Sequence, residues 1–176
     1  MNMRYYAGIG SRETPEDVQD LMAAIAVVAA RQGMILRSGA AEGADSAFEK
    51  GADAIRGPKE IFLPWNNFNG RHGGERWVEV GVCERSLEIA KEYHPNWSAL
   101  REGGRKLMAR NVYQILGSDL QSPVELVICW TKNGNGRGGT GQALRIARDM
   151  NIPIHDLGKP EVLAAYMRRI DKERGR

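Results

Sequence analysis

Three strand-like segments that each end in a glycine-rich turn before a helix constrain the fold of this chain most. They are residues 4–9, 34–37 and 124–130. Shorter segments with strand character lie at residues 60–63 and 152–155, and segments with helical periodicity separate the strands. Parallel strands need helical crossovers of this kind, and such crossovers are right-handed. The sequence therefore predicts an α/β fold, namely a Rossmann-like, doubly wound, mostly parallel sheet with helices on both faces.

The length of 176 residues, with 42% hydrophobic and 27% charged residues, predicts one globular domain over residues 1–176. Thr14 is expected to cap the first helix, with Pro15 at its first position. Residues 64–100 break the strand–helix rhythm and form an insert rich in aromatic and basic residues. A basic helix is predicted over about residues 160–173, and its charge fits a solvated helix end better than a DNA contact.

Charge and cysteine content narrow the classes of function. The net charge of +3 and the pI near 9.0 allow a polyanionic partner but do not require one. The cysteines, Cys83 and Cys129, do not indicate a disulfide framework, and Cys129 is expected to be a buried thiol in an apolar strand. The sequence has no signal-peptide pattern and no apolar run of membrane-spanning length. We therefore expect a cytoplasmic protein without a membrane partner.

The histidines do not fall into a metal-binding pattern. No group of His, Cys and carboxylate residues has the ligand spacing of a metal site, so we expect no metal and no dedicated cofactor. His155 and Asp156, adjacent at the end of the last strand segment, are expected to form a surface pair.

The glycine-rich turns indicate where a ligand binds, because ligands of open parallel sheets bind at the carboxyl ends of the strands. Glycine lets the backbone approach a phosphate, and the following helix N-terminus offers free N–H groups. One such turn is usually only turn geometry, whereas three at one sheet edge favour a phosphate site. The candidate ligand-binding residues in the three turns are Gly10, Ser11, Arg12, Ser38, Gly39, Ala40, Glu42, Gly43, Asp45, Gly138, Gly139, Thr140 and Gly141. Thr140 is expected to cap its helix.

Two further candidates lie outside the turns. Arg110 precedes the strongest strand and is a candidate phosphate contact. Trp65 directly follows a strand end, where it either stacks on a base or packs the insert onto the sheet.

The turns resemble motifs of the SLOG superfamily, which joins the DNA-processing proteins (DprA/Smf) and the Lonely Guy proteins. Gly10-Ser11-Arg12 resembles the glycine-serine-arginine motif of DprA, and residues 38–45 resemble its serine-glycine-(x)-alanine-(x)-glycine-(x)-aspartate motif. Gly138-Gly139-Thr140-Gly141 resembles the double-glycine phosphate loop of Lonely Guy and carrier-like proteins. The resemblance covers most of residues 4–157 and extends to small stand-alone DprA-like proteins of bacteriophages. It implies a nucleotide-derived ligand or single-stranded DNA, and a homodimer or higher homo-oligomer.

The departures from these families bear on catalysis. Lonely Guy enzymes carry a glutamate a few residues after their phosphate loop, whereas residues 142–146 of this chain contain no carboxylate. Glu42 is the one weak candidate for a catalytic residue, acting from another turn. The chain also has no clear extra helical domain of the kind found in DprA. The leading hypothesis is therefore non-catalytic binding of a free nucleotide or an ADP-ribose-type signal. DprA-like binding of single-stranded DNA and a nucleoside monophosphate phosphoribohydrolase activity are the alternatives.

Overall fold

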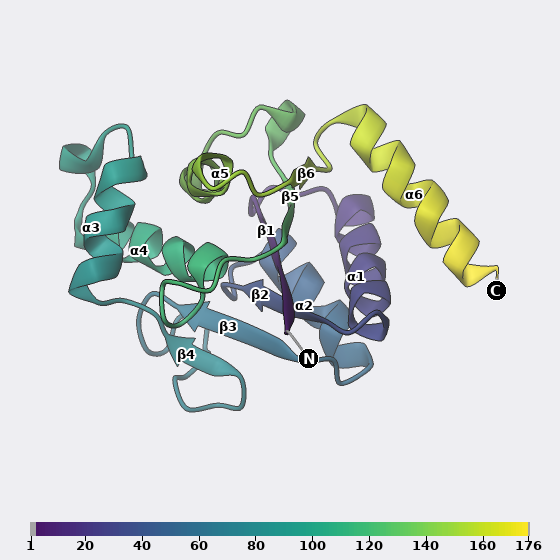
Figure 1. Cartoon of the computed structure of the whole chain (residues 1–176), viewed down its shortest axis with the longest axis horizontal. Helices are drawn as coiled ribbons and strands as arrows, with labels where there is room; N and C mark the ends of the chain where they lie inside the picture. Colours follow the sequence, from purple (N-terminus) through teal and green to yellow (C-terminus); the bar gives the residue numbers. More distant parts are fainter. Residues whose placement is uncertain (1–2, 176) are drawn as a thin grey trace.

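The computed structural model describes residues 3–175, whose strands form one parallel sheet in the order β4-β3-β2-β1-β5-β6 (Figure 1). The strands are β1 (Arg4–Gly10), β2 (Met34–Ser38), β3 (Lys59–Leu63), β4 (Val78–Val80), β5 (Leu126–Trp130) and β6 (Ile154–Asp156). The helices are α1 (Glu16–Arg31), α2 (Ala44–Ala54), α3 (Glu84–Tyr93), α4 (Glu102–Leu116), α5 (Gly139–Asp149) and α6 (Pro160–Arg174), with short 3-10 helices at Trp97–Ala99 and Lys132–Gly134. The strand order reverses between β1 and β5, so the predicted doubly wound α/β fold is confirmed.

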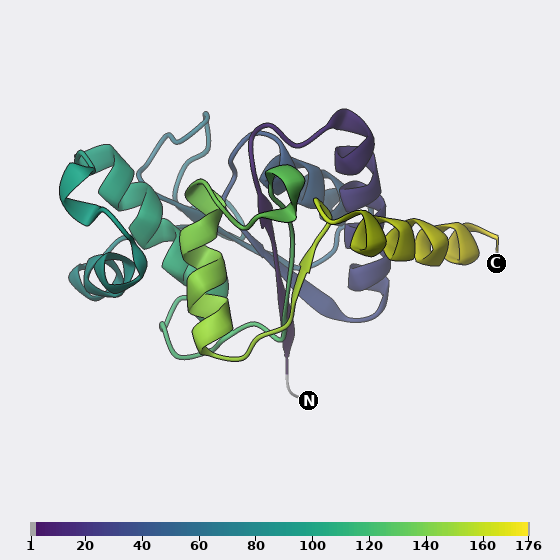
Figure 2. The ribbon, with the colours of Figure 1, turned by 90° about the horizontal axis from the view of Figure 1, so that it is seen from above.

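Helices cover both faces of the sheet, as Figures 1 and 2 show. Helices α1, α2 and α6 pack against one face, where Tyr6, Met22 and Phe48 belong to one buried apolar cluster. Helices α3, α4 and α5 pack against the other face, over a cluster that contains Ile9 and Val127. Each face thus has its own hydrophobic core.

Strand β1 lies in the middle of the sheet and sends alternate side chains to the two faces. Tyr6 belongs to the core beneath α1 and α2, whereas Ala7 and Ile9 belong to the core beneath α4 and α5. A Cβ atom on Gly8 would lie 2.6 Å from the Phe48 ring, so Gly8 lets α2 approach β1 closely. This close packing brings the start of α2 next to the end of β1.

The insert at residues 64–100 contains a strand that the sequence did not predict. Val78–Val80 pairs with β3 as a three-residue edge strand, directly after Trp77, whose φ is +70°. So short a segment within a polar loop lacks the alternation by which strands are recognised. At the opposite edge, β6 follows Pro153, in agreement with the edge or strand-start position that this proline favours.

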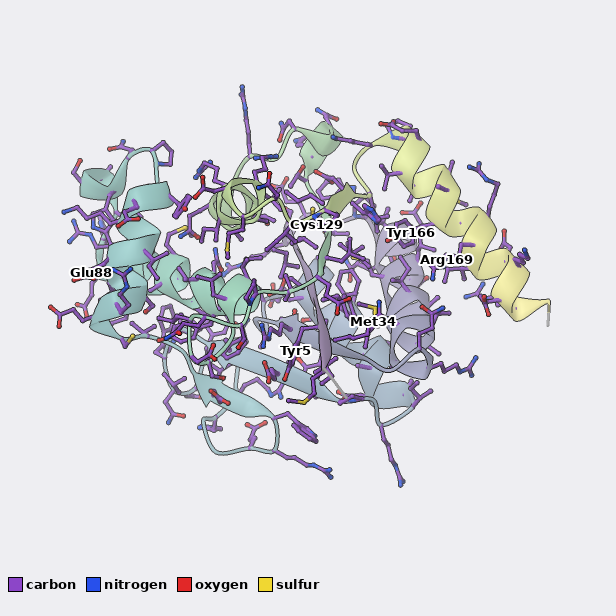
Figure 3. The ribbon with its side chains drawn as sticks, viewed as in Figure 1. Tyr5, Met34, Glu88, Cys129, Tyr166 and Arg169 are labelled. Carbon is purple, nitrogen blue, oxygen red and sulfur yellow. The ribbon has the colours of Figure 1, made fainter. Side chains whose placement is uncertain are left out.

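The predicted basic helix extends to Arg174 as α6 and packs along α1 (Figure 1). Tyr166 and Arg169 lie on the face of α6 turned toward α1 (Figure 3), and Arg169 donates a hydrogen bond to Gln32 at 3.2 Å. Within the described part of the chain, no helix is long and apolar enough to cross a membrane.

Several local expectations need correction. Pro15, not Thr14, takes the N-cap position of α1, and the Thr14 hydroxyl instead donates to the Ser11 carbonyl at 2.7 Å. His155 and Asp156 are not a surface pair, because Asp156 is only 3% exposed and His155 shares a 2.7 Å hydrogen bond with the Tyr166 hydroxyl. The expected burial of Cys129 is confirmed, and burial raises the pKa of its thiol.

Candidate functional site

A pocket of about 440 Å³ lies at the carboxyl ends of β1, β2 and β5, where the strand order reverses. Its lining comes from the segments after β1 and β2, from one side of α4 and from the start of α5. The predicted site residues in the lining are Gly10, Ser11, Arg12, Asp45, Arg110, Gly138, Gly139 and Thr140. The other lining residues are Ile9, Glu13, Ala41, Leu107, Met108, Asn111, Gln114 and Arg137. The remaining predicted site residues, Ser38, Gly39, Ala40, Glu42, Gly43, Trp65 and Gly141, do not line it.

The turn after β1 is held by its own hydrogen bonds. The Ser11 N–H donates to the Trp130 carbonyl at 3.1 Å, and the Ser11 hydroxyl oxygen accepts the Glu13 N–H at 3.0 Å. A Cβ atom on Gly10 would lie 2.7 Å from the Ala44 Cβ atom, so glycine is required for the packing of this turn against α2. Arg12 projects from the turn with an exposed side chain.

Several residues of the turn after β2 pack the fold together instead of facing the pocket. The buried Ser38 hydroxyl donates to the Gly8 carbonyl at 2.6 Å. A Cβ atom on Gly39 would lie 2.3 Å from the Gln114 amide nitrogen. Gly43 has φ +81°, and a Cβ atom there would lie 2.6 Å from the Ser11 carbonyl oxygen. Gly43 therefore packs the second turn against the first, whereas Ser38 bonds to β1 and Gly39 packs against α4.

Glu42, the candidate catalytic residue, lies away from this pocket. It is exposed and lines a separate open groove together with Ser46 and Glu49. Trp65 is 37% exposed and contacts the Phe68 ring edge-to-face, with ring centroids 5.3 Å apart. Both residues therefore stand outside the cavity that the glycine turns surround.

Buried polar side chains form the floor of the pocket. The Asp45 carboxylate accepts the Gly39 N–H at 3.1 Å and the Gln114 amide at 3.4 Å. The Arg110 guanidinium donates to the carbonyl oxygens of Gly39 and Phe62, the latter at 3.3 Å. The floor thus ties α4 to the turn after β2 and to β3 itself.

Burial also changes the ionisation of the floor. Removal from water raises the pKa of Asp45 to about 6, although Arg110 and backbone N–H groups act in the opposite direction. Burial lowers the pKa of Arg110 to about 10, and nearby Arg12 adds to this effect while Asp45 opposes it. Arg110 therefore stays cationic near neutral pH, while the Asp45 carboxyl loses its proton at a higher pH than an exposed aspartate.

The N-terminus of α5 forms one wall of the pocket. Its N-cap is Gly138 and not Thr140, and among the described residues no side chain caps it. Its first turn carries no acidic residue, whereas α1 begins with Glu16 and Asp17 and α2 has Asp45 in its first turn. Of the three predicted turns, only this one leaves the positive end of its helix without a nearby carboxylate on the same helix.

Arginine side chains complete the rim. Arg137 directly precedes Gly138 and is exposed, as is Arg12. No carboxylate in the described residues 3–175 forms an ion pair with either side chain. Asn111 supports this side of the pocket, because its amide donates to the Gly139 carbonyl at 3.1 Å while its oxygen accepts Arg110 Nε at 3.1 Å. The rim therefore offers unpaired positive charge beside free backbone N–H groups.

The contribution of α4 was missed by sequence reasoning, apart from Arg110. Leu107, Asn111 and Gln114 lie on the same helix face as Arg110. The signal was a polar stripe of Arg110, Asn111 and Gln114, at spacings of one, three and four residues, on a helix whose other inward residues are apolar. Within residues 3–175, no three His, Cys, Asp or Glu side chains gather where they could hold a metal ion.

Comparison with known proteins shows the fold of this chain. No protein-family model matches the sequence, and no curated protein matches it. DNA processing protein A from Helicobacter pylori, which binds single-stranded DNA, matches with a TM-score of 0.57 and 18% identity, over 96% of this chain and 79% of that chain. The Moco carrier protein from Chlamydomonas rheinhardtii matches with a TM-score of 0.52 and 14% identity, over 98% of this chain and 87% of that chain. At such low identity, the likeness establishes a shared fold and nothing finer.

Proposed function

We propose that this chain binds a phosphate-bearing nucleotide, either a free nucleotide or an ADP-ribose-type molecule, in the pocket between β1 and α5. One observation carries the proposal: the uncapped N-terminus of α5 meets the unpaired Arg12 and Arg137 around one cavity. Free backbone N–H groups and guanidinium groups are the donors that phosphate prefers. The SLOG-like motifs in the turns that form this cavity support the same ligand class.

The rest of the cavity fits the remainder of a nucleotide. A volume of about 440 Å³ falls within the range of roughly 300–1,000 Å³ typical of small-molecule sites. Ile9, Leu107 and Met108 offer apolar contacts to a base or sugar. The Gln114 amide offers a polar group that can orient it. Phosphate at the α5 end and the nucleoside over the α4 side is the arrangement that these chemical types favour.

We infer that binding serves sensing or sequestration and not bond cleavage. Glu42 lies outside the pocket, and the lining carboxylates are Asp45 and Glu13. The Asp45 carboxylate is held by the Gly39 N–H and by Gln114, so it is committed to the fold. Incubation with nucleoside monophosphates should therefore release no free base. Base release that Glu42→Gln abolishes would establish the phosphoribohydrolase alternative.

A ligand panel tests the proposal. Nucleoside mono-, di- and triphosphates, ADP-ribose and a short single-stranded oligonucleotide are compared by thermal shift at fixed salt. A ligand at about 100 times its Kd adds about 2.7 kcal/mol of stability, which raises Tm by roughly 5–11 °C for a chain of this length. Arg137→Ala and Gly139→Asp should remove the shift, whereas Arg168→Ala on the exposed face of α6 should keep it. An unchanged shift in both pocket variants would contradict the proposed site.

Binding of single-stranded DNA is the second candidate. The shared fold with a DNA processing protein A and the exposed Trp65 favour it. Its affinity should fall with salt and rise with oligonucleotide length, because each bound phosphate releases counterions. If only the oligonucleotide raises Tm, this reading replaces the small-ligand proposal.

A further inference from the structure

Asp156, at the end of β6, is a buried carboxylate that does not line the pocket but is connected to it. Its side chain is 3% exposed and lies among backbone and hydroxyl donors. One carboxylate oxygen accepts the N–H groups of Thr131 and Gly158, both at 2.9 Å. The other oxygen accepts the Thr131 hydroxyl. Its donors therefore come from the loop after β5 as well as from its own loop.

Thr131 connects Asp156 by hydrogen bonds to the part of the loop that leads to α5. Because its hydroxyl hydrogen is donated to Asp156, its oxygen is free to accept the Gly136 N–H, at 2.9 Å. Its backbone carbonyl accepts the Gly134 N–H, also at 2.9 Å. Asp156 is thus connected, through the N–H and the buried hydroxyl of Thr131, to the loop that precedes Arg137.

The loop is also packed directly against its neighbours. A Cβ atom on Gly158 would lie 2.0 Å from the Thr131 carbonyl oxygen, so the loops after β5 and β6 touch backbone to backbone. A Cβ atom on Gly141 would lie 2.6 Å from the Gly136 carbonyl oxygen, so the same loop touches the first turn of α5. A shift of Gly136 must therefore move the start of α5 or the side chain that follows in sequence, Arg137.

We propose that Asp156 is a positioning residue for the ligand pocket: through Thr131 and Gly136 it holds Arg137 and the N-terminus of α5 in the orientation that binds the ligand. The inference rests on the proposed nucleotide site. It gives a role in ligand binding to a residue that does not itself line the pocket. A carboxylate suits the role because both of its oxygens accept hydrogen bonds. An asparagine in its place would point an N–H group at one of the donors.

The test compares two substitutions at one position. Thr131→Val keeps the size of the side chain but removes the hydroxyl relay, whereas Thr131→Ser keeps the relay. Asp156→Asn removes one acceptor from the same network. Ser86→Ala, which removes a buried hydroxyl that caps α3, is the control for loss of a hydrogen bond away from the pocket. Each variant is checked for folding by circular dichroism.

Two measurements are made, namely the Kd for ADP by calorimetry and hydrogen exchange of residues 131–141. We expect Thr131→Val and Asp156→Asn to raise the Kd about tenfold and to speed exchange at Gly134 and Gly136. Thr131→Ser and Ser86→Ala should match the wild type in both. Equal Kd and equal exchange in Thr131→Val and Thr131→Ser would overturn the positioning role. If the wild type binds no ADP, the proposed function fails for that probe, and the exchange comparison alone decides whether the relay fixes the loop.

Discussion

The buried carboxyl of Asp45 should make the folded protein less stable as pH rises from 4 to 7. Burial raises its pKa from 3.8 to about 6 in the folded state. Between these values the folded state binds more protons than the unfolded state, so raising the pH favours unfolding. A shift of about two pKa units corresponds to about 3 kcal/mol at pH 7, most of it lost between pH 4 and 7.

Asp45→Asn isolates this effect, because asparagine does not titrate. Its stability at any one pH also reflects altered bonding to the Gly39 N–H, so the informative quantity is the difference from the wild type as a function of pH. Urea unfolding followed by tryptophan fluorescence gives both free energies. The free energy of unfolding of the wild type minus that of Asp45→Asn should fall by about 2–3 kcal/mol from pH 4 to 7.

A second carboxylate provides a control of opposite sign. Backbone N–H groups of Gln121 and Ser122, with the Ser122 hydroxyl, lower the pKa of the exposed Asp119. Its contribution to stability is therefore lost as pH falls through its folded pKa, and Asp119→Asn should reduce that dependence. A flat or rising difference for Asp45→Asn would refute the reasoning, since it would mean that Arg110 and the backbone N–H groups outweigh burial.

Three further outcomes follow from packing, charge and assembly. Gly43→Ala should destabilise the fold by about 2–3 kcal/mol, because Gly43 has φ +81° and its Cβ atom would lie 2.6 Å from a carbonyl oxygen. Gly33→Ala is the control, because Gly33 has φ +77° but nothing lies within 4 Å of its Cβ atom. It should lose less stability in the same urea titration. Lys59→Met removes the ion pair with the buried Glu49, but Arg71 still contacts Glu49 at 2.8 Å. The loss of stability should therefore be smaller than the roughly 3–5 kcal/mol expected when a buried pair is fully broken. Chemical denaturation of the wild type and the variant measures this difference. Light scattering should give a homodimer or larger assembly, and a monomer mass across concentrations would contradict that expectation.

The fold could be predicted because its main signals are local. Apolar runs, glycine stops and helical periodicity fix which segments become β1, β2 and β5, and the handedness of parallel crossovers leaves few ways to arrange them. The short strand β4 could not be found in this way, because its pairing with β3 is decided by contacts across the insert. The burial of Asp156 was equally hidden, since two of its donors belong to Thr131, which lies 25 residues earlier in sequence.

The site could be predicted only in part, because the sequence treats the three glycine turns as equals. In the structure, Gly39 and Gly43 are needed where backbones and side chains pass closely, whereas nothing lies within 4 Å of a Cβ atom on Gly138. A sequence pattern shows that glycine is present but not what approaches it. Arg137 and Gln114 were missed for a related reason, since a residue lines the pocket only if the fold turns its helix or loop toward the cavity.

The charge of the pocket limits how it can bind a polynucleotide. Arg110 is buried and already bonded to protein carbonyls, so the exposed cations of the lining are Arg12 and Arg137. Contact with two phosphates of single-stranded DNA corresponds to a slope of about −1.4 in log K against log salt. A measured slope of that size would mean that an oligonucleotide binds through this pocket alone. A much steeper slope would require cations elsewhere, and Arg137→Ala would then lower affinity by far less than the salt dependence implies.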